Sequence, residues 1–179
     1  MSKTLGGGIP LAGVITTDAI EESCHRRGFA FYTSHVSDPL PATVGLAVLQ
    51  TIEQERLLMR SREMGDYLVA RLRELQARHA EIGDVRGMGL LRGIELVKDR
   101  ESREPHHELG ALTTARCLEL GLSMNIRRRP ERGSVWRIAP PLTVKREDID
   151  LAMTIFDQAL TEMKGVVAGR RSGTMLAAR

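Results

Sequence analysis

Lys3 is the first residue in this sequence whose type and surroundings suggest a site. Three consecutive glycines follow it at positions 6–8. Glycine has no Cβ, so a glycine run lets the backbone approach a ligand closely and adopt positive φ angles. An exposed lysine without a function would look the same locally. Both interpretations stay open, and Lys3 is a candidate site residue.

Arg137 is the second candidate, because it stands in an apolar stretch that reads VWRIAPP. A guanidinium group among residues that favour burial needs a partner, and a carboxylate in bidentate geometry satisfies it best. The partner is either the carboxylate of a ligand or an internal Asp or Glu. The local sequence does not distinguish between these two.

Three further motifs are weaker candidates. Residues 87–93, GMGLLRG, have the spacing G-x-G-x-x-x-G and no strand–turn–helix unit around them, so tight turns are favoured over a nucleotide site. His106 and His107 have no second ligand pair at a suitable spacing for a metal. The basic loop 127–132 is typical of a solvated surface.

The composition is that of a soluble globular protein, with 42% hydrophobic and 27% charged residues. A net charge of +3 and 3% aromatic residues argue against a nucleic-acid partner. Cys24 and Cys117 do not form a disulfide framework, and Cys24 is expected to pack rather than to act as a nucleophile. No signal peptide or membrane-spanning stretch is recognised, so we expect a cytoplasmic protein.

The first half of the chain is predicted to contain a strand, a short helix, a loop and a long helix. The strand covers residues 11–16, and the short helix begins at Thr17-Asp18 and ends at Gly28. Prolines make residues 29–41 a loop or a strand end. Apolar spacing of three and four predicts a helix over residues 42–79, which is long enough that a break is expected near residues 55–57.

The second half alternates strands and helices, which indicates an α/β or α+β fold. Glycine-rich alternation predicts two short strands or one bulged strand within residues 82–97, followed by a helix over 109–121. Strands are predicted at 122–126 and from 135 onward, separated by a hairpin-like loop, and a final helix at 145–164.

Residues 62–164 are therefore expected to fold as a sheet of three or four strands with helices on one face. The expected core consists of the larger apolar residues at the periodic positions: Val85, Leu90, Ile94, Leu112, Leu118, Met124, Ile138, Ile155 and Phe156.

Five blocks of sequence, in this order and spacing, resemble the C-terminal part of the class III (fold type I) pyridoxal-phosphate aminotransferases, and within that family the dialkylglycine decarboxylase subgroup most of all. The resemblance covers residues 2–164, and its blocks are SKTLGGGIPLAGVITT, FYTSHVSDPLPATVGLAVL, IGDVRGMGLLRGIELVKDR, GLSMNI and WRIAPPLTV.

The resemblance implies an α/β fold in which the end of a large cofactor-binding domain is joined by a long helix to an α+β small domain. Residues 1–61 would form the remnant of the large domain and the interdomain helix. Residues 62–164 would form the C-terminal small domain, and residues 165–179 a flexible tail. The chain would then be a truncated member of the family that lacks the N-terminal half.

The resemblance also implies roles for individual residues. Lys3 matches the lysine that forms a Schiff base with pyridoxal phosphate, and Arg137 matches the arginine that binds the substrate carboxylate. Ser34 matches a threonine that reaches the cofactor phosphate from the neighbouring subunit. Ser34, Val36 and Asp38 match positions around an alkali-metal ion, potassium or sodium, in the decarboxylase subgroup.

The implied activity is decarboxylation-coupled transamination, with amino acids and keto acids as substrates and a homo-oligomer as the assembly. The alternative is a catalytically inactive fragment, or a split-gene subunit that only pairs with another chain. Because Lys3 has no preceding domain in this sequence, the isolated chain is expected to bind pyridoxal phosphate weakly and without turnover.

Overall fold

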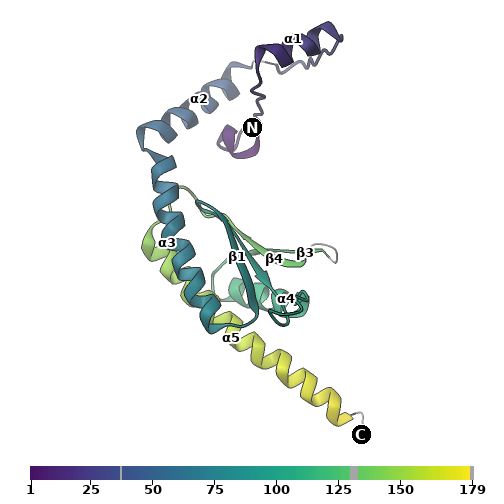
Figure 1. The fold of residues 1–179 in the computed structure, drawn as a ribbon. Coiled ribbons are helices and arrows are strands. Elements are labelled where there is room, and N and C mark those ends of the chain that lie inside the picture. Colours follow the sequence, from purple (N-terminus) through teal and green to yellow (C-terminus); the bar gives the residue numbers. More distant parts are fainter. Residues whose placement is uncertain (37, 130–132, 178–179) are drawn as a thin grey trace. The chain divides into compact units, whose positions relative to one another are not determined.

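The computed structural model describes residues 1–36, 38–129 and 133–177, with the backbone course alone for 125–129 and 171–177. The chain divides into two compact units, Met1–Leu58 and Met59–Arg179 (Figure 1). The sequence places its domain boundary after residue 61, three residues beyond this division.

The first unit contains a 3-10 helix η1 (Lys3–Gly6) and the helices α1 (Asp18–Arg26) and α2 (Pro39–Gln54). Helix α1 begins after Thr17 as predicted, with acidic residues in its first turn. Helix α2 begins at Pro39 rather than at residue 42, because a proline at the first helical position needs no N–H partner. The strand predicted at 11–16 is wrong: the segment is irregular, and no described strand pairs with it.

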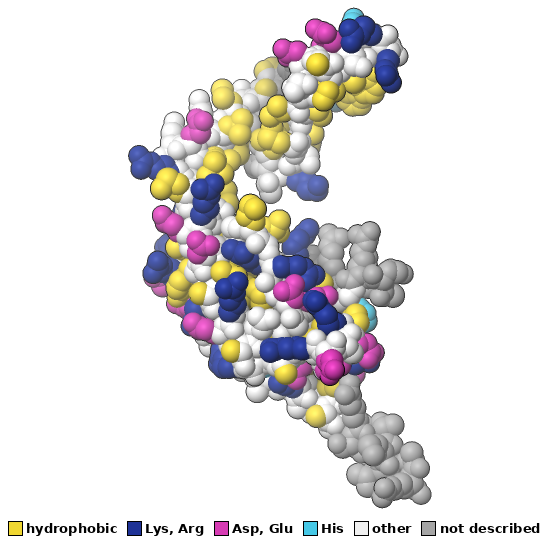
Figure 2. Space-filling view, in the orientation of Figure 1, with side chains coloured by type: hydrophobic (Ala, Val, Ile, Leu, Met, Phe, Trp, Pro, Cys, Tyr) yellow, Lys and Arg dark blue, Asp and Glu magenta, His cyan; other side chains and the backbone are white. Residues whose placement is uncertain are grey.

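Helix α2 is apolar around most of its circumference, yet only Gly45 of its residues is buried. Figure 2 shows hydrophobic side chains gathered along the unit that contains α1 and α2, and Leu40, Leu46 and Leu49 are exposed. Helices of this composition are normally covered by further protein.

The predicted break in the long helical segment is confirmed at Glu55 and Arg56. Helix α2 ends at Gln54 and α3 (Leu57–Arg78) begins two residues after Glu55. Arg56 adopts a φ of 51°, in the left-handed region that interrupts a right-handed helix.

The second unit is built on a four-stranded antiparallel sheet, which confirms the predicted strand number. The strands are β1 (Ile82–Met88), β2 (Leu91–Leu96), β3 (Asn125–Arg129) and β4 (Gly133–Ile138), in the spatial order β1-β2-β4-β3. Two further helices accompany the sheet, α4 (His107–Glu119) and α5 (Arg146–Ala177).

One face of the sheet forms the core together with α3, α4 and α5. Trp136 on β4 packs edge-on against Phe156 on α5, with ring centroids 4.8 Å apart. Of the nine predicted core residues, Leu90, Ile94 and Phe156 are buried, Val85, Leu112, Met124 and Ile138 pack against the core in part, and Ile155 is half-buried. Leu118 is wrong, because it is 65% exposed on the outer face of α4.

Helix α5 continues to Ala177. The predicted end of the final helix at Lys164, before a flexible tail, is therefore wrong. Buried residues recur at helical spacing past residue 164. Val167 belongs to the same core cluster as Leu160, and Met163 packs against that cluster. Gly165 and Gly169 lie within this helix, where neither glycine interrupts it.

Candidate functional site

Lys3 is an exposed residue with an unusual backbone conformation. Its φ is 58°, a value that costs free energy in a residue with a Cβ. Its side-chain amine makes no hydrogen bond or ion pair with any part of the chain that the structure describes. An unpaired amine on a strained backbone is available to a ligand.

The segment around Lys3 is held against α2 by close packing at glycines. A Cβ on Gly45 of α2 would lie 2.5 Å from Cδ2 of Leu11, so the glycine makes room for that leucine. Gly7 approaches Val44 and Val48 on the same helix and has a φ of 56°. The glycine run therefore serves backbone packing and turning at this position.

Ser34, Val36 and Asp38 lie together in the loop between α1 and α2. Ser34 and Val36 are exposed, and Asp38 precedes the first residue of α2. One carboxylate oxygen of Asp38 is 2.8 Å from Nδ1 of His35. Among the described residues, no group of three or more His, Cys, Asp or Glu side chains is arranged to hold a metal ion. No hydrogen bond between described residues links Lys3 to this loop.

Arg137 lies in the second unit, on β4, and its side chain is exposed. Strand alternation places it on the opposite face of the sheet from its buried neighbour Trp136. The apolar neighbours of Arg137 in the sequence therefore do not bury its side chain. No described carboxylate pairs with this guanidinium.

The open face of the sheet carries a set of ion pairs next to Arg137. Arg86 contacts Asp84 at 2.7 Å and Glu95 at 3.1 Å, and Arg103 contacts Glu95 at 3.1 Å. The hydrogen bond from Arg86 to Asp84 is the largest cause that raises the pKa of Arg86. Glu95 is thus neutralised by two arginines, and among the described residues no carboxylate is paired with the positive charge of Arg137.

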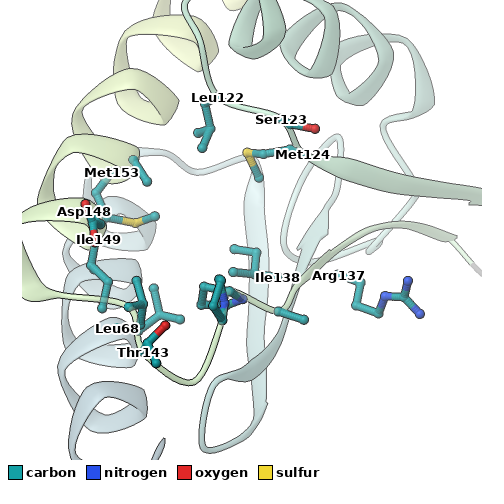
Figure 3. A pocket seen from close by; sticks show the side chains of 15 residues that line it. Leu68, Leu122, Ser123, Met124, Arg137, Ile138, Thr143, Asp148, Ile149 and Met153 are labelled. Carbon is teal, nitrogen blue, oxygen red and sulfur yellow. The ribbon is translucent and has the colours of Figure 1, made fainter. Parts of the chain in front are cut away.

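Beside the end of β4 the second unit has a cavity of about 690 Å³ with mainly apolar walls. Leu68, Met124, Ile138 and Met153 contribute to its lining (Figure 3). Arg137 stands at its rim, and its guanidinium points away from the cavity in Figure 3. Sequence reasoning missed this cavity, although Pro140-Pro141 marks the loop that bounds it.

The loop that follows β4 is fastened to α3 by Arg60. Its guanidinium donates hydrogen bonds to the carbonyl oxygens of Thr143, at 3.2 Å, and Val144, at 2.8 Å. These bonds fix the chain segment that leaves the strand carrying Arg137.

The weaker motifs have structural roles. The segment 87–93 contains the tight turn between β1 and β2, which is formed by residues 89–90, and Gly87 and Gly89 have positive φ. Nδ1 of His106 accepts a hydrogen bond from the Leu109 N–H at the start of α4. Residues 127–129 belong to β3, and 130–132 lie outside the described residues. Of the described helices, none is long and apolar enough to span a membrane.

Comparison with known proteins places this fold among pyridoxal-phosphate-dependent transaminases. A structure from a study of transaminase evolution by ancestral reconstruction matches with a TM-score of 0.79 and 31% identity, over 93% of this chain and 38% of that one. The model of the aminotransferase class-III family matches residues 1–160. The chain therefore belongs to the class III aminotransferase family.

Two curated relatives are similar to most of the chain. An uncharacterized aminotransferase of Schizosaccharomyces pombe is 46% identical over 161 residues, which make up 90% of this chain and 36% of the relative. A leucine/methionine racemase of Thermococcus litoralis is 35% identical over 164 residues, 92% of this chain and 36% of the racemase. The chain thus spans about 36% of the length of these relatives.

Membership of the family implies pyridoxal phosphate as cofactor. The residues present fit this group: Lys3 offers an unpaired amine, the nucleophile that a carbonyl cofactor requires. Ser34 offers an exposed hydroxyl, which can donate to a phosphate oxygen.

Proposed function

We propose that this chain supplies the cofactor-binding lysine and the carboxylate-binding arginine of a class III enzyme that transfers amino groups between amino acids and keto acids. The observation that carries the proposal is the family match over residues 1–160, which includes both Lys3 and Arg137. The unpaired side chains of these two residues support it.

Lys3 would hold pyridoxal phosphate through its side-chain nitrogen. Bound pyridoxal phosphate supplies an electron sink for the bond that breaks at the substrate Cα. The Lys3 amine would also act as a general base and acid and move a proton at that carbon. The strained backbone at Lys3 supports a function for this residue.

Arg137 would bind the substrate carboxylate through two parallel hydrogen bonds from its planar guanidinium. These hydrogen bonds would fix the orientation of the substrate, and this orientation would determine which bond to Cα is broken. The absence of an internal carboxylate partner among the described residues supports the role, since the guanidinium is left for a ligand.

The finer proposal is decarboxylation-coupled transamination, as in the dialkylglycine decarboxylase subgroup that the sequence blocks resemble. In it, Ser34 contacts the cofactor phosphate of a neighbouring subunit in a homo-oligomer. Ser34, Val36 and Asp38 contribute to a site for potassium or sodium. Neither Cys24 nor Cys117 forms a disulfide in the described part of the chain, and this supports the proposal that the protein is located in a reducing cytoplasm.

A chimera tests the proposal, with this chain in place of the matched 161-residue segment of the S. pombe aminotransferase. After gel filtration establishes assembly, the chimera is given pyruvate with either 2-aminobutyrate, a donor with a hydrogen on Cα, or 2-aminoisobutyrate, a 2,2-dialkylglycine. We expect amino transfer from both, with carbon dioxide released only from 2-aminoisobutyrate.

Amino transfer from 2-aminobutyrate, with neither amino transfer nor carbon dioxide release from 2-aminoisobutyrate, would overturn the finer proposal and leave transamination in place, because the Cα of 2-aminoisobutyrate has no hydrogen to lose. An assembled chimera that transfers no amino group would overturn catalysis by this chain and favour a subunit that only pairs with another chain.

The alkali-metal site is tested separately. Reaction rates in potassium, sodium and tetramethylammonium chloride are compared for the unsubstituted chimera and for Asp38→Asn. Equal rates in all three salts would contradict it.

A further inference from the structure

Gly93 lies on β2, a central strand of the sheet, where a glycine is costly. Glycine in a strand interior loses more backbone entropy than other residues and offers no side chain for packing. Such a glycine commonly marks a turn, a close approach of two backbones, or the approach of a ligand.

The structure gives Gly93 no steric reason to lack a side chain. A Cβ there would lie 3.5 Å from Cγ1 of Val135 and 3.7 Å from Cγ of Arg86, which are ordinary van der Waals contacts. A Cβ on Gly65 or Gly83, by contrast, would lie 2.3 Å or 2.8 Å from its nearest neighbour. Gly93 also avoids the positive φ values that favour glycine.

The position of Gly93 suggests a different reason. Across the β2–β4 ladder it lies directly opposite Arg137, and across the β1–β2 ladder opposite Arg86. Directly opposite residues share one face of a sheet. The row Arg86–Gly93–Arg137 therefore runs across the open face with a gap at its centre.

The charges around this gap favour an anion. Arg86 is committed to Asp84 and Glu95, and Glu95 is also bound by Arg103. Glu95 is thus balanced by two cations and does not compete for Arg137. Among the described residues the guanidinium of Arg137, the residue opposite Gly93 on β4, has no partner.

We propose that Gly93 keeps open the space in which the substrate carboxylate lies against Arg137, and so determines which carboxylates reach that arginine. This inference rests on the proposed function of Arg137. A side chain at position 93 would stand beside that of Arg137, with Cβ atoms about 4.5–5.5 Å apart in such a pair. A large one would occupy the volume of the ligand.

The test is a titration of the 179-residue chain with pyruvate, a carboxylate without an amine, followed through the arginine side-chain nitrogen resonances. The Arg137 signal is identified by its absence in Arg137→Gln. We expect pyruvate to shift this signal in the wild type, and Gly93→Leu to weaken binding about tenfold or more. Gly93→Ala is expected to have a smaller effect in the same direction.

Leu91→Phe is the matched control, because Leu91 is exposed on the same strand and pairs with Met88 rather than with Arg137. It enlarges a side chain on the open face and is expected to leave pyruvate binding unchanged. Thermal unfolding of each variant verifies that the sheet is intact, and Gly93→Ala is expected to be at least as stable as the wild type.

The outcomes separate the two proposals. If pyruvate shifts the Arg137 signal and folded Gly93→Leu binds as tightly as the wild type, the inference about Gly93 is overturned and the role of Arg137 stands. If Leu91→Phe weakens pyruvate binding as much as Gly93→Leu, any larger side chain on the open face weakens binding, and the inference about Gly93 is overturned as well. If pyruvate leaves the Arg137 signal unchanged in the wild type, the proposed role of Arg137 fails and the inference fails with it.

Discussion

The guanidinium of Arg92 donates a 3.0 Å hydrogen bond to the carbonyl oxygen of Gly65, which links β2 to α3. A second bond of 2.7 Å reaches the carbonyl oxygen of Gly87 in β1. Arg92 is 8% exposed, so these bonds satisfy a charge that is largely removed from water. The helix that leads into the second unit is thereby fixed to the same sheet that carries Arg137.

This contact requires α3 to lie very close to the β1–β2 turn. Gly65→Ala would place a Cβ 2.3 Å from the backbone carbonyl of Gly89, which cannot move without shifting the turn. We expect the variant to lower the free energy of unfolding by about 1–3 kcal/mol, measured by urea denaturation.

Gly165→Ala is the matched control, since Gly165 is also inside a helix but has nothing within 4 Å of an added Cβ. There alanine is expected to raise the free energy of unfolding by about 0.5–1 kcal/mol. Equal effects of the two substitutions would show that helix propensity, rather than packing against Gly89, governs position 65.

Arg137→Lys separates charge from geometry at the carboxylate site. Lysine keeps the positive charge and loses the planar fork that binds a carboxylate through two bonds. In the chimera we expect kcat/KM for amino acids to fall about a hundredfold, with cofactor absorbance little changed. Turnover equal to that of the unsubstituted chimera would contradict the assignment of Arg137.

Local signals predicted the helices and the sheet well, because they depend on spacing within one segment. The break at Glu55–Arg56 followed from the length of the apolar pattern, and the turn at 87–93 from its glycines. The strand expected at 11–16 failed because a strand also needs a neighbouring strand, which its own residues do not reveal. Leu118 failed because it lies on the face of α4 that is exposed to solvent.

For the candidate site, the sequence identified the residues but not their surroundings. Arg137 follows a buried tryptophan, and its apolar neighbours suggested burial, whereas strand alternation exposes it. The gap at Gly93 and the pairing of Glu95 with two arginines depend on the register of strands far apart in sequence. No local pattern specifies that register. The roles of Lys3, Ser34, Val36, Asp38 and Arg137 stay predictions.

Cys117 predicts a pH dependence of stability. The residue is fully buried on α4, and burial raises the pKa of its thiol from 9.0 to about 11. The folded state therefore keeps the proton over a range in which the unfolded state loses it, so stability falls as the pH rises from 9.0 to about 11.

The measurement is the free energy of unfolding of the wild type and Cys117→Ala at both ends of this range. Between them the wild type should lose about 2 kcal/mol more than the variant, which has no thiol to titrate. Parallel pH profiles would show that Cys117 ionises in the folded protein as it does in the unfolded chain.

The most direct test of the account is the identity of the lysine that binds the cofactor. The chain has four lysines, and Lys98 and Lys164 are paired with Glu104 and Glu81. The chimera, loaded with pyridoxal phosphate, is reduced with borohydride and mapped by peptide mass spectrometry, with Lys145→Arg as the control and Lys3→Arg as the test variant. We predict one pyridoxyl group per chain on Lys3, unchanged in Lys145→Arg and absent in Lys3→Arg. An assembled chimera with its label on another lysine, or an undiminished label in Lys3→Arg, would contradict the account.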